Sequence, residues 1–133
     1  MTHKELERYI LTKPGAWLDY PFGEEVAVYK VGAKGGEGNP DADGQGKMFA
    51  LIPENKHPVQ ISLKCDPLLA EELRAEYESV QPGYHLNKKH WNTIIVTGQL
   101  EQEYLLSLVD LSYRLVVESL PKAEQAKFKD PLI

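Results

Sequence analysis

The fold is decided by residues 59–67, Val59-Gln60-Ile61-Ser62-Leu63-Lys64-Cys65-Asp66-Pro67. Apolar and polar side chains alternate through Lys64, which is the period of a strand with one covered face and one wet face. Asp66 can cap a helix, and Pro67 suits the first helical position because proline has no amide hydrogen to leave unpaired. The stretch therefore predicts a strand that leads directly into a helix.

Similar signals lie on both sides of this stretch. The expected helices begin at a capping box formed by Thr2 and Glu5, at Asp66, and near Glu101. They cover about residues 2–13, 66–80 and 101–120. The expected strands are 26–31, 47–52, 59–64, 84–86 and 92–97. Residues 16–23 are expected to form a loop whose aromatic side chains fold over an edge of the core.

This order, helix, three strands, helix, two strands, helix, predicts one α+β domain over residues 1–133. Strands joined by short connections pair antiparallel, so the helices must collect on one face of the sheet. The result is a two-layer sandwich. The six glycines of residues 32–46 predict a flexible hairpin insertion, and residues 121–133 form a short tail.

Composition limits the classes of protein. The chain carries 15 basic and 20 acidic residues, for a formal net charge of −5, so it is not a general polycation. No apolar run is long enough to span a membrane, and the first residues do not resemble a secretory signal. Cys65 is the single cysteine, which excludes an intramolecular disulfide and suits a reducing environment. We therefore expect a cytoplasmic protein.

The sequence predicts no enzyme, no cofactor and no metal site. The four histidines follow no zinc spacing, and residues 39–44 resemble a calcium loop only until position twelve, which is Ala50 instead of glutamate. P-loop and nucleophile-elbow motifs are absent. Cys65 follows a strand and precedes a helix, but a small buried side chain is the favoured interpretation over a thiol nucleophile.

Charge placement is more informative than net charge. Residues 66–80 carry five acids and one arginine, whereas residues 81–100 carry Lys88 and Lys89 with no acid. A two-layer domain with acidic helices and basic loops can turn one side toward a polyanion. Residues 84–92 mix cations, amides, imidazoles and an indole, the side chains that commonly contact phosphates and grooves. The alternative interpretation of the same residues is a solvated lysine turn with Trp91 in the core. If this segment binds DNA, the candidate phosphate contacts are Lys88, Lys89 and His90, and the candidate groove contacts are Asn87, Trp91 and Asn92.

Several sequence blocks resemble the MmcQ/YjbR family of small bacterial proteins. The blocks are Pro21-Phe22-Gly23, Tyr29-Lys30-Val31, residues 46–50, residues 61–67, Pro82-Gly83-Tyr84-His85-Leu86-Asn87-Lys88-Lys89-His90-Trp91-Asn92-Thr93, and residues 110–113. The resemblance implies an α-β(3)-α-β(2)-α, CyaY-like fold that is similar to secretion chaperones. It also implies DNA binding through a double wing of loops, here residues 32–46 and 87–91, and it adds Lys34, Lys47 and Lys64 to the candidate binding residues. It implies no enzymatic activity.

A second hypothesis concerns the helix over residues 101–120. Its apolar arc is wider than one sheet face can cover, so the helix is either enclosed within the domain or part of a dimer interface. The alternative function is therefore a dimeric, chaperone-like protein-interaction module without a nucleic-acid partner.

Overall fold

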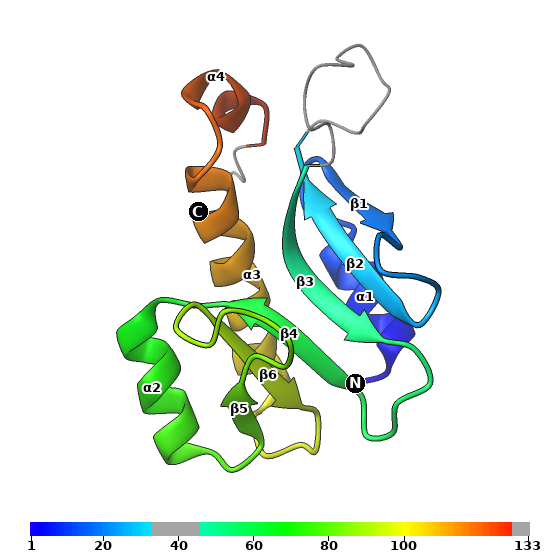
Figure 1. Cartoon of the computed structure of the whole chain (residues 1–133), viewed down its shortest axis with the longest axis vertical. Helices are drawn as coiled ribbons and strands as arrows, with labels where there is room; N and C mark the ends of the chain where they lie inside the picture. Colours follow the sequence, from blue (N-terminus) through cyan, green and yellow to red (C-terminus); the bar gives the residue numbers. More distant parts are fainter. Residues whose placement is uncertain (33–45, 129–133) are drawn as a thin grey trace.

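A single antiparallel sheet organises the computed structural model, which describes residues 1–32 and 46–128. Its six strands lie in the order β1-β2-β3-β4-β6-β5. The strands are β1 (Ala16–Asp19), β2 (Val26–Val31), β3 (Lys47–Pro53), β4 (Gln60–Lys64), β5 (Val80–Pro82) and β6 (Trp91–Ile95). The helices are α1 (His3–Ile10), α2 (Pro67–Glu76), α3 (Gln102–Glu118) and α4 (Lys122–Gln125), followed by the 3-10 turn η1 (Ala126–Phe128). The α+β class and its antiparallel sheet are confirmed (Figure 1).

Two of the three predicted helix starts, at Thr2 and Asp66, are confirmed by side-chain hydrogen bonds. The Thr2 hydroxyl accepts from the Glu5 amide at 3.1 Å, and the Glu5 carboxylate accepts from the Thr2 amide at 2.9 Å. At α2, the Asp66 carboxylate accepts from the amides of Leu68 and Leu69 at 3.2 and 3.3 Å. These side chains satisfy amides that have no partner within the helix.

The main core fills the space between the sheet and the helices. Figure 1 shows α1 and α3 on the far side of the sheet. A register shift after Tyr29 leaves Phe49 as a bulge in β3, so that both Phe49 and Ala50 join the main core. The Phe49 ring packs edge-on against Tyr113 with centroids 5.3 Å apart. Ser112 of α3 donates to the Phe49 carbonyl at 2.6 Å, which fixes α3 to the bulge.

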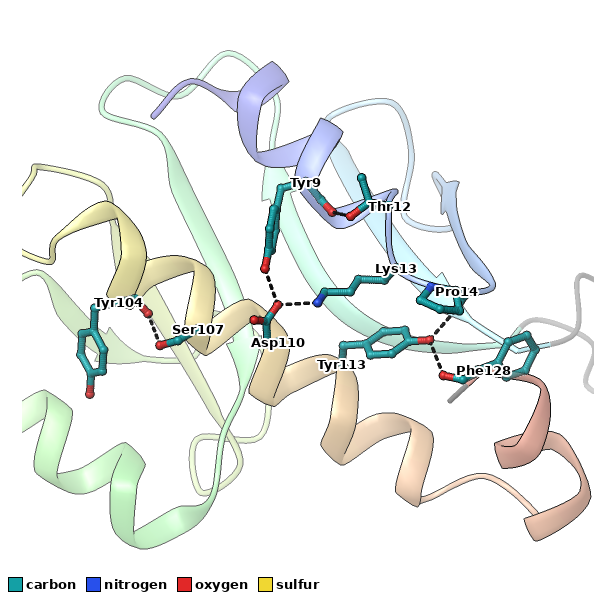
Figure 2. A network of polar contacts seen from close by, with 9 residues as sticks. All are labelled: Tyr9, Thr12, Lys13, Pro14, Tyr104, Ser107, Asp110, Tyr113 and Phe128. Atoms are coloured by element: carbon teal, nitrogen blue, oxygen red, sulfur yellow. Dashed lines mark hydrogen bonds and ion pairs between the residues drawn. The ribbon is translucent and has the colours of Figure 1, made fainter. Parts of the chain in front are cut away.

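The sequence left two alternatives for the wide apolar arc of α3, enclosure within the domain or a dimer interface. In the structure, part of this arc is enclosed within the domain. Leu105, Leu108, Val109, Ser112, Tyr113, Val116 and Val117 are buried. The segment that follows α1 covers another side of α3, as Figure 2 shows. Tyr9 donates to Asp110 at 2.7 Å, and the Lys13 ammonium lies 2.6 Å from the same carboxylate.

Two strand predictions were wrong. The aromatic segment expected as a loop contains β1, which pairs with β2 and extends the sheet by one strand. In β1 the Asp19 carboxylate accepts from Lys30 at 2.9 Å. Residues 84–86, expected as a strand, form turns, and the edge strand is β5. The short length of β1 and β5 explains the error, because three or four residues do not establish a period.

The second face of the sheet is less wet than the alternation predicted. Val28, Leu51 and Trp91 form a separate buried cluster on it. Ser62, expected to face water, is 6% exposed and shares a hydrogen bond of 2.8 Å with Thr93. The prediction was wrong here because the loop after β5 contacts this face: Leu86 packs against the buried cluster, and the Tyr84 amide donates to the Thr93 hydroxyl at 3.0 Å.

Two further expectations concern the ends and the insertion. Residues 33–45 of the expected hairpin insertion lie outside the described residues. Of the tail, residues 122–128 form α4 and η1. None of the helices in the described part of the chain is long and apolar enough to cross a membrane.

Candidate nucleic-acid interface

The loop of residues 83–90 connects β5 to β6 and carries most of the predicted site. Backbone hydrogen bonds hold both of its ends. The Gly83 amide donates to the Trp91 carbonyl at 2.9 Å, and the amides of His90 and Trp91 donate to the Asn87 carbonyl at 3.2 and 3.0 Å. The His90 carbonyl in turn accepts from the Cys65 amide at 2.8 Å, which ties the loop to the end of β4. The loop is therefore anchored to the sheet.

Two backbone positions set the path of this loop. A side chain at Gly83 would place its Cβ 2.7 Å from the Trp91 Cβ, a distance that real Cβ atoms do not tolerate. His85 adopts a φ of 59°, in the left-handed region where, after glycine, asparagine, aspartate and histidine are the most frequent residues. The Tyr84 amide donates to the Thr93 hydroxyl at 3.0 Å. These constraints turn the chain outward directly after β5.

The loop presents a polar and aromatic surface to solvent. Its exposed side chains are Tyr84, His85, Asn87, Lys88 and Lys89. Tyr84 is 69% exposed, and its ring lies against that of His85 with centroids 4.0 Å apart. Side chains of this kind can stack on a base and contact phosphates.

In the part of the chain that the structure describes, neither lysine of the loop forms an ion pair with a carboxylate. The Lys88 ammonium donates to the Gly83 carbonyl at 2.9 Å. The Lys88 carbonyl accepts from Arg74 of α2 at 3.0 Å, so that helix contributes a cation to the loop. Within residues 1–32 and 46–128, no ion pair joins Lys88 or Lys89 to a carboxylate. The loop therefore has an excess of positive charge.

The other predicted lysines lie in different places. Lys64 of β4 is paired with Trp91 across the sheet, so it belongs to the same end of the sheet as the loop. Lys47 begins β3, where its ammonium donates to the carbonyl and hydroxyl of Ser119 at 3.3 and 3.4 Å, at the end of α3. That ammonium is engaged by the helix terminus. Lys34 lies outside the described residues.

Three predicted site residues are less accessible than the loop lysines. Trp91 is 9% exposed and belongs to the buried cluster on the second face. Asn92 is 2% exposed, and its amide donates to the Ala70 carbonyl at 3.3 Å. These two side chains support the loop from inside and do not reach the surface where a groove contact would be made. His90 is half-buried.

Sequence reasoning missed Arg74, which was counted only as part of an acidic helix. In the structure its guanidinium donates to the Lys88 carbonyl at 3.0 Å, so it reaches the loop from α2. Tyr84 and His85 belong to the predicted segment of residues 84–92 but were not singled out, because residues 84–86 were assigned to a strand. The available signal for a loop was the turn pair Pro82-Gly83, followed by residues that are mostly polar or aromatic.

The described residues show little catalytic chemistry near this surface. Burial, followed by the neighbouring Asp66 charge, raises the pKa of the Cys65 thiol to about 11, which keeps it protonated at neutral pH. Among residues 1–32 and 46–128 no cluster of three or more histidine, cysteine or acidic side chains is placed to hold a metal ion.

The comparison with known families fits this geometry. The model of the family described as YjbR matches residues 11–115, which include the whole sheet and the loop of residues 83–90. This chain belongs to the YjbR family. It is 34% identical to the uncharacterized protein YjbR of Escherichia coli K12 over 125 residues, covering 94% of this chain and 95% of the relative. It is 33% identical to the uncharacterized protein YyaQ of Bacillus subtilis over 121 residues, covering 86% and 98%.

Two solved structures share the fold of this chain. A crystal structure of a Deinococcus radiodurans protein with a DUF419 domain superposes with a TM-score of 0.83 at 36% identity, covering 96% of this chain and 87% of that one. A crystal structure of a Pseudomonas syringae protein gives a TM-score of 0.66 at 25% identity, with coverage of 87% and 99%. The YjbR fold therefore accounts for almost the whole chain.

Proposed function

We propose that this YjbR protein is a non-enzymatic, cytoplasmic DNA-binding protein that contacts phosphates through the loop of residues 83–90. The observation that supports the proposal is the pair Lys88 and Lys89, which no carboxylate neutralises in the described part of the chain. Arg74 and Lys64 add positive charge at the same end of the sheet. Tyr84 and His85 provide rings beside these cations.

The anchoring of the loop favours binding. Because the backbone is already fixed by Gly83, Asn87 and Thr93, little conformational freedom is lost when phosphates are bound. Two to four phosphate contacts predict weak and salt-sensitive binding, with the logarithm of the association constant falling against the logarithm of salt at a slope of roughly −2 to −4. Although the net charge is −5, the acidic helices repel the polyanion, so the protein is expected to approach DNA with the loop facing it.

The experiment is a titration of a fluorescent DNA duplex at two salt concentrations. Lys88→Glu/Lys89→Glu should weaken binding at least tenfold, because each reversal turns an attraction into a repulsion. Lys4→Glu/Lys122→Glu is the matched control, since it makes the same change in net charge at two exposed lysines outside the loop. Equal losses in both double variants would show that net charge alone governs binding. An unchanged affinity of the loop variant would exclude this loop as the contact.

A second proposal, a dimeric protein-interaction module, is favoured by one observation on α3. Tyr104, Leu111 and Leu115 fall on one stripe of the helix, and none of them is fully buried. Burying such side chains across an interface contributes about 1.5–3 kcal/mol each. Light scattering at high micromolar concentration tests this alternative, which a monomeric mass would exclude.

A further inference from the structure

A hollow of about 320 Å³ lies between the end of α2 and the start of α3, away from the proposed DNA-binding loop. Four side chains line it, namely Tyr77, Gln99, Glu101 and Tyr104. Tyr77 is the residue at which α2 ends, and Glu101 is the residue at which α3 begins. The two helix termini therefore bring two aromatic rings and a carboxylate to one place.

The two rings are placed so that one ligand can contact both. Their centroids are 6.5 Å apart and their planes are inclined at 48°. Figure 2 shows the Tyr104 ring pointing from α3 toward α2. Tyr104 is 37% exposed, so the pair is open to solvent. A cation within about 6 Å of an aromatic centroid is attracted by the ring quadrupole, and this spacing allows one cation to meet that condition for both rings.

The charge around the rings also favours a cation. Glu101 makes no side-chain hydrogen bond to the start of α3, so its carboxylate is not engaged as a helix cap. Burial, then Tyr77, Glu76, Cys65 and Glu72 in that order, raise the pKa of the Tyr104 hydroxyl. Two glutamates of α2 are therefore close enough to act on this ring, and the phenol stays neutral at physiological pH.

The same features argue against an anion. A helix amino terminus ordinarily attracts negative charge, but here the residue at that terminus is the acidic Glu101, and further acids lie on α2. Gln99 contributes no free acceptor, because its carbonyl oxygen accepts from the Ser79 amide at 2.9 Å and from the Ser79 hydroxyl at 2.6 Å. What remains is an aromatic surface with a negative surround.

We propose that Tyr77, Tyr104 and Glu101 form a binding site for a methylated ammonium group. The rings supply cation–π attraction, and the carboxylate supplies charge complementarity without requiring a hydrogen-bond donor on the ligand. A methylated ammonium suits this site better than a primary amine or a guanidinium, because its methyl groups can pack on the two ring faces and it has no N–H groups whose hydrogen bonds to water would have to be replaced. The group can belong to a free choline-like molecule or to a trimethylated lysine of a peptide.

The experiment measures the NMR signals of the Tyr77 and Tyr104 rings during titration with choline. Its neutral isostere, 3,3-dimethyl-1-butanol, is the matched ligand control. Choline should shift both rings with a dissociation constant in the range of about 1–10 mM, as expected for a small open site. The neutral alcohol should shift them at least about fivefold more weakly, because it lacks the cation–π term. Equal shifts by both ligands would overturn the proposal. So would the absence of any shift with choline at concentrations up to about 100 mM, ten times the upper end of the expected dissociation constant.

Variants assign the site and distinguish it from general effects on the fold. Tyr104→Leu should weaken choline binding at least about fivefold, whereas Tyr104→Phe should retain it because the ring is kept. Glu101→Gln should also weaken binding, and Tyr84→Leu should not, because Tyr84 is an exposed tyrosine of the other loop. Loss of binding in Tyr104→Phe would overturn a cation–π site. A trimethyllysine peptide that binds at least tenfold more tightly than choline assigns the group to a peptide, and equal affinity assigns it to a free molecule.

Discussion

Two groups of lysines in this protein have opposite surroundings. Lys30 is 4% exposed, lies 2.9 Å from the Asp19 carboxylate, and stands over the Trp17 ring at 5.4 Å from its centroid. Lys13 is similar, with the Asp110 carboxylate at 2.6 Å and the Tyr9 ring at 5.2 Å (Figure 2). In the loop of residues 83–90, by contrast, Lys88 meets a carbonyl and Lys89 is exposed.

The difference separates cations that stabilise the fold from cations that are free to bind. A buried ammonium costs several kcal/mol unless a counter-ion accompanies it, so the interior lysines each have a carboxylate. A lysine on an anchored loop incurs no such cost. Its charge remains available to a polyanion in solution, and the predictions below test this separation.

The largest effect is expected at Asp19. Asp19→Asn should lower the free energy of unfolding by about 3 kcal/mol, because it leaves Lys30 buried without its carboxylate. Chemical denaturation measures the loss. Glu118→Gln is the control, since Arg114 and Glu118 form an exposed pair at 3.7 Å and its loss should cost less than about 0.5 kcal/mol. Similar losses in the two variants would show that burial does not separate the two classes.

The pH dependence of stability provides a second test of the same pair. The hydrogen bond from Lys30 lowers the pKa of the Asp19 carboxyl below its usual value. A group whose pKa is lower in the folded state contributes stability above its unfolded pKa, near 4, and that contribution is lost as the pH falls through the folded value. The difference in stability between wild type and Asp19→Asn should therefore shrink below about pH 4. A constant difference from pH 7 to pH 2 would contradict this prediction.

Gly83→Ala should have the next largest effect, about 1–3 kcal/mol of lost stability. The added Cβ would lie 2.7 Å from the Trp91 Cβ and 3.0 Å from the Trp91 carbonyl oxygen, and neither atom is the end of a flexible side chain. The loop must move, so DNA affinity should fall together with stability. Gly23→Ala is unsuitable as a control, because Gly23 has a φ of 99° and a side chain at that φ would itself strain the backbone. Ala123→Gly, at an exposed position of α4, is preferable.

Arg74→Met should cost about 1 kcal/mol of stability. The substitution keeps the apolar stem but removes the hydrogen bonds to the carbonyls of Ala70 and Lys88, at 3.2 and 3.0 Å. Thermal unfolding measures the change, with Arg8→Met on α1 as the exposed comparison. Protection of the amides of residues 87–91 from hydrogen exchange should fall in Arg74→Met alone.

The smallest effect on stability is expected at Lys89. Lys89→Gln should change the free energy of unfolding by less than about 0.5 kcal/mol, because the ammonium has no carboxylate partner in the described chain. It should nevertheless reduce the salt slope of DNA binding by about one. A large loss of stability with an unchanged slope would place Lys89 among the structural cations.

Local sequence signals predicted most of the fold. Caps at Thr2 and Asp66 work through contacts within four residues, so they are visible in the sequence. Long alternating strands and the periodic α3 are equally local. Strand β1 is different, because it is held by pairing with β2 and by the contact of Asp19 with Lys30, eleven residues away. A pairing between distant segments leaves little trace in a four-residue stretch.

The candidate site was predictable in part. The density of cations in residues 87–90 identified the loop, since charge is a property of composition. The accessibility of each side chain depends on packing, which local composition does not reveal. Trp91 and Asn92 share the loop motif but are buried, while Arg74 reaches the loop from another element. Burial is decided by the alternation of β6, which begins at Trp91 and turns these side chains toward the two faces of the sheet.

One hydroxyl group joins the beginning and the end of the described chain. Tyr113 faces the carbonyls of Pro14 and Phe128, and a Cβ at Gly15 would meet the Phe128 ring at 2.2 Å (Figure 2). A fusion or truncation placed just after residue 120 would thus disturb the segment between α1 and β1, more than a hundred positions earlier in the chain. Expression tags are therefore better attached at the amino terminus. In footprinting by mass spectrometry, a change that increases labelling of the segment after residue 120 should also increase labelling of the segment between α1 and β1.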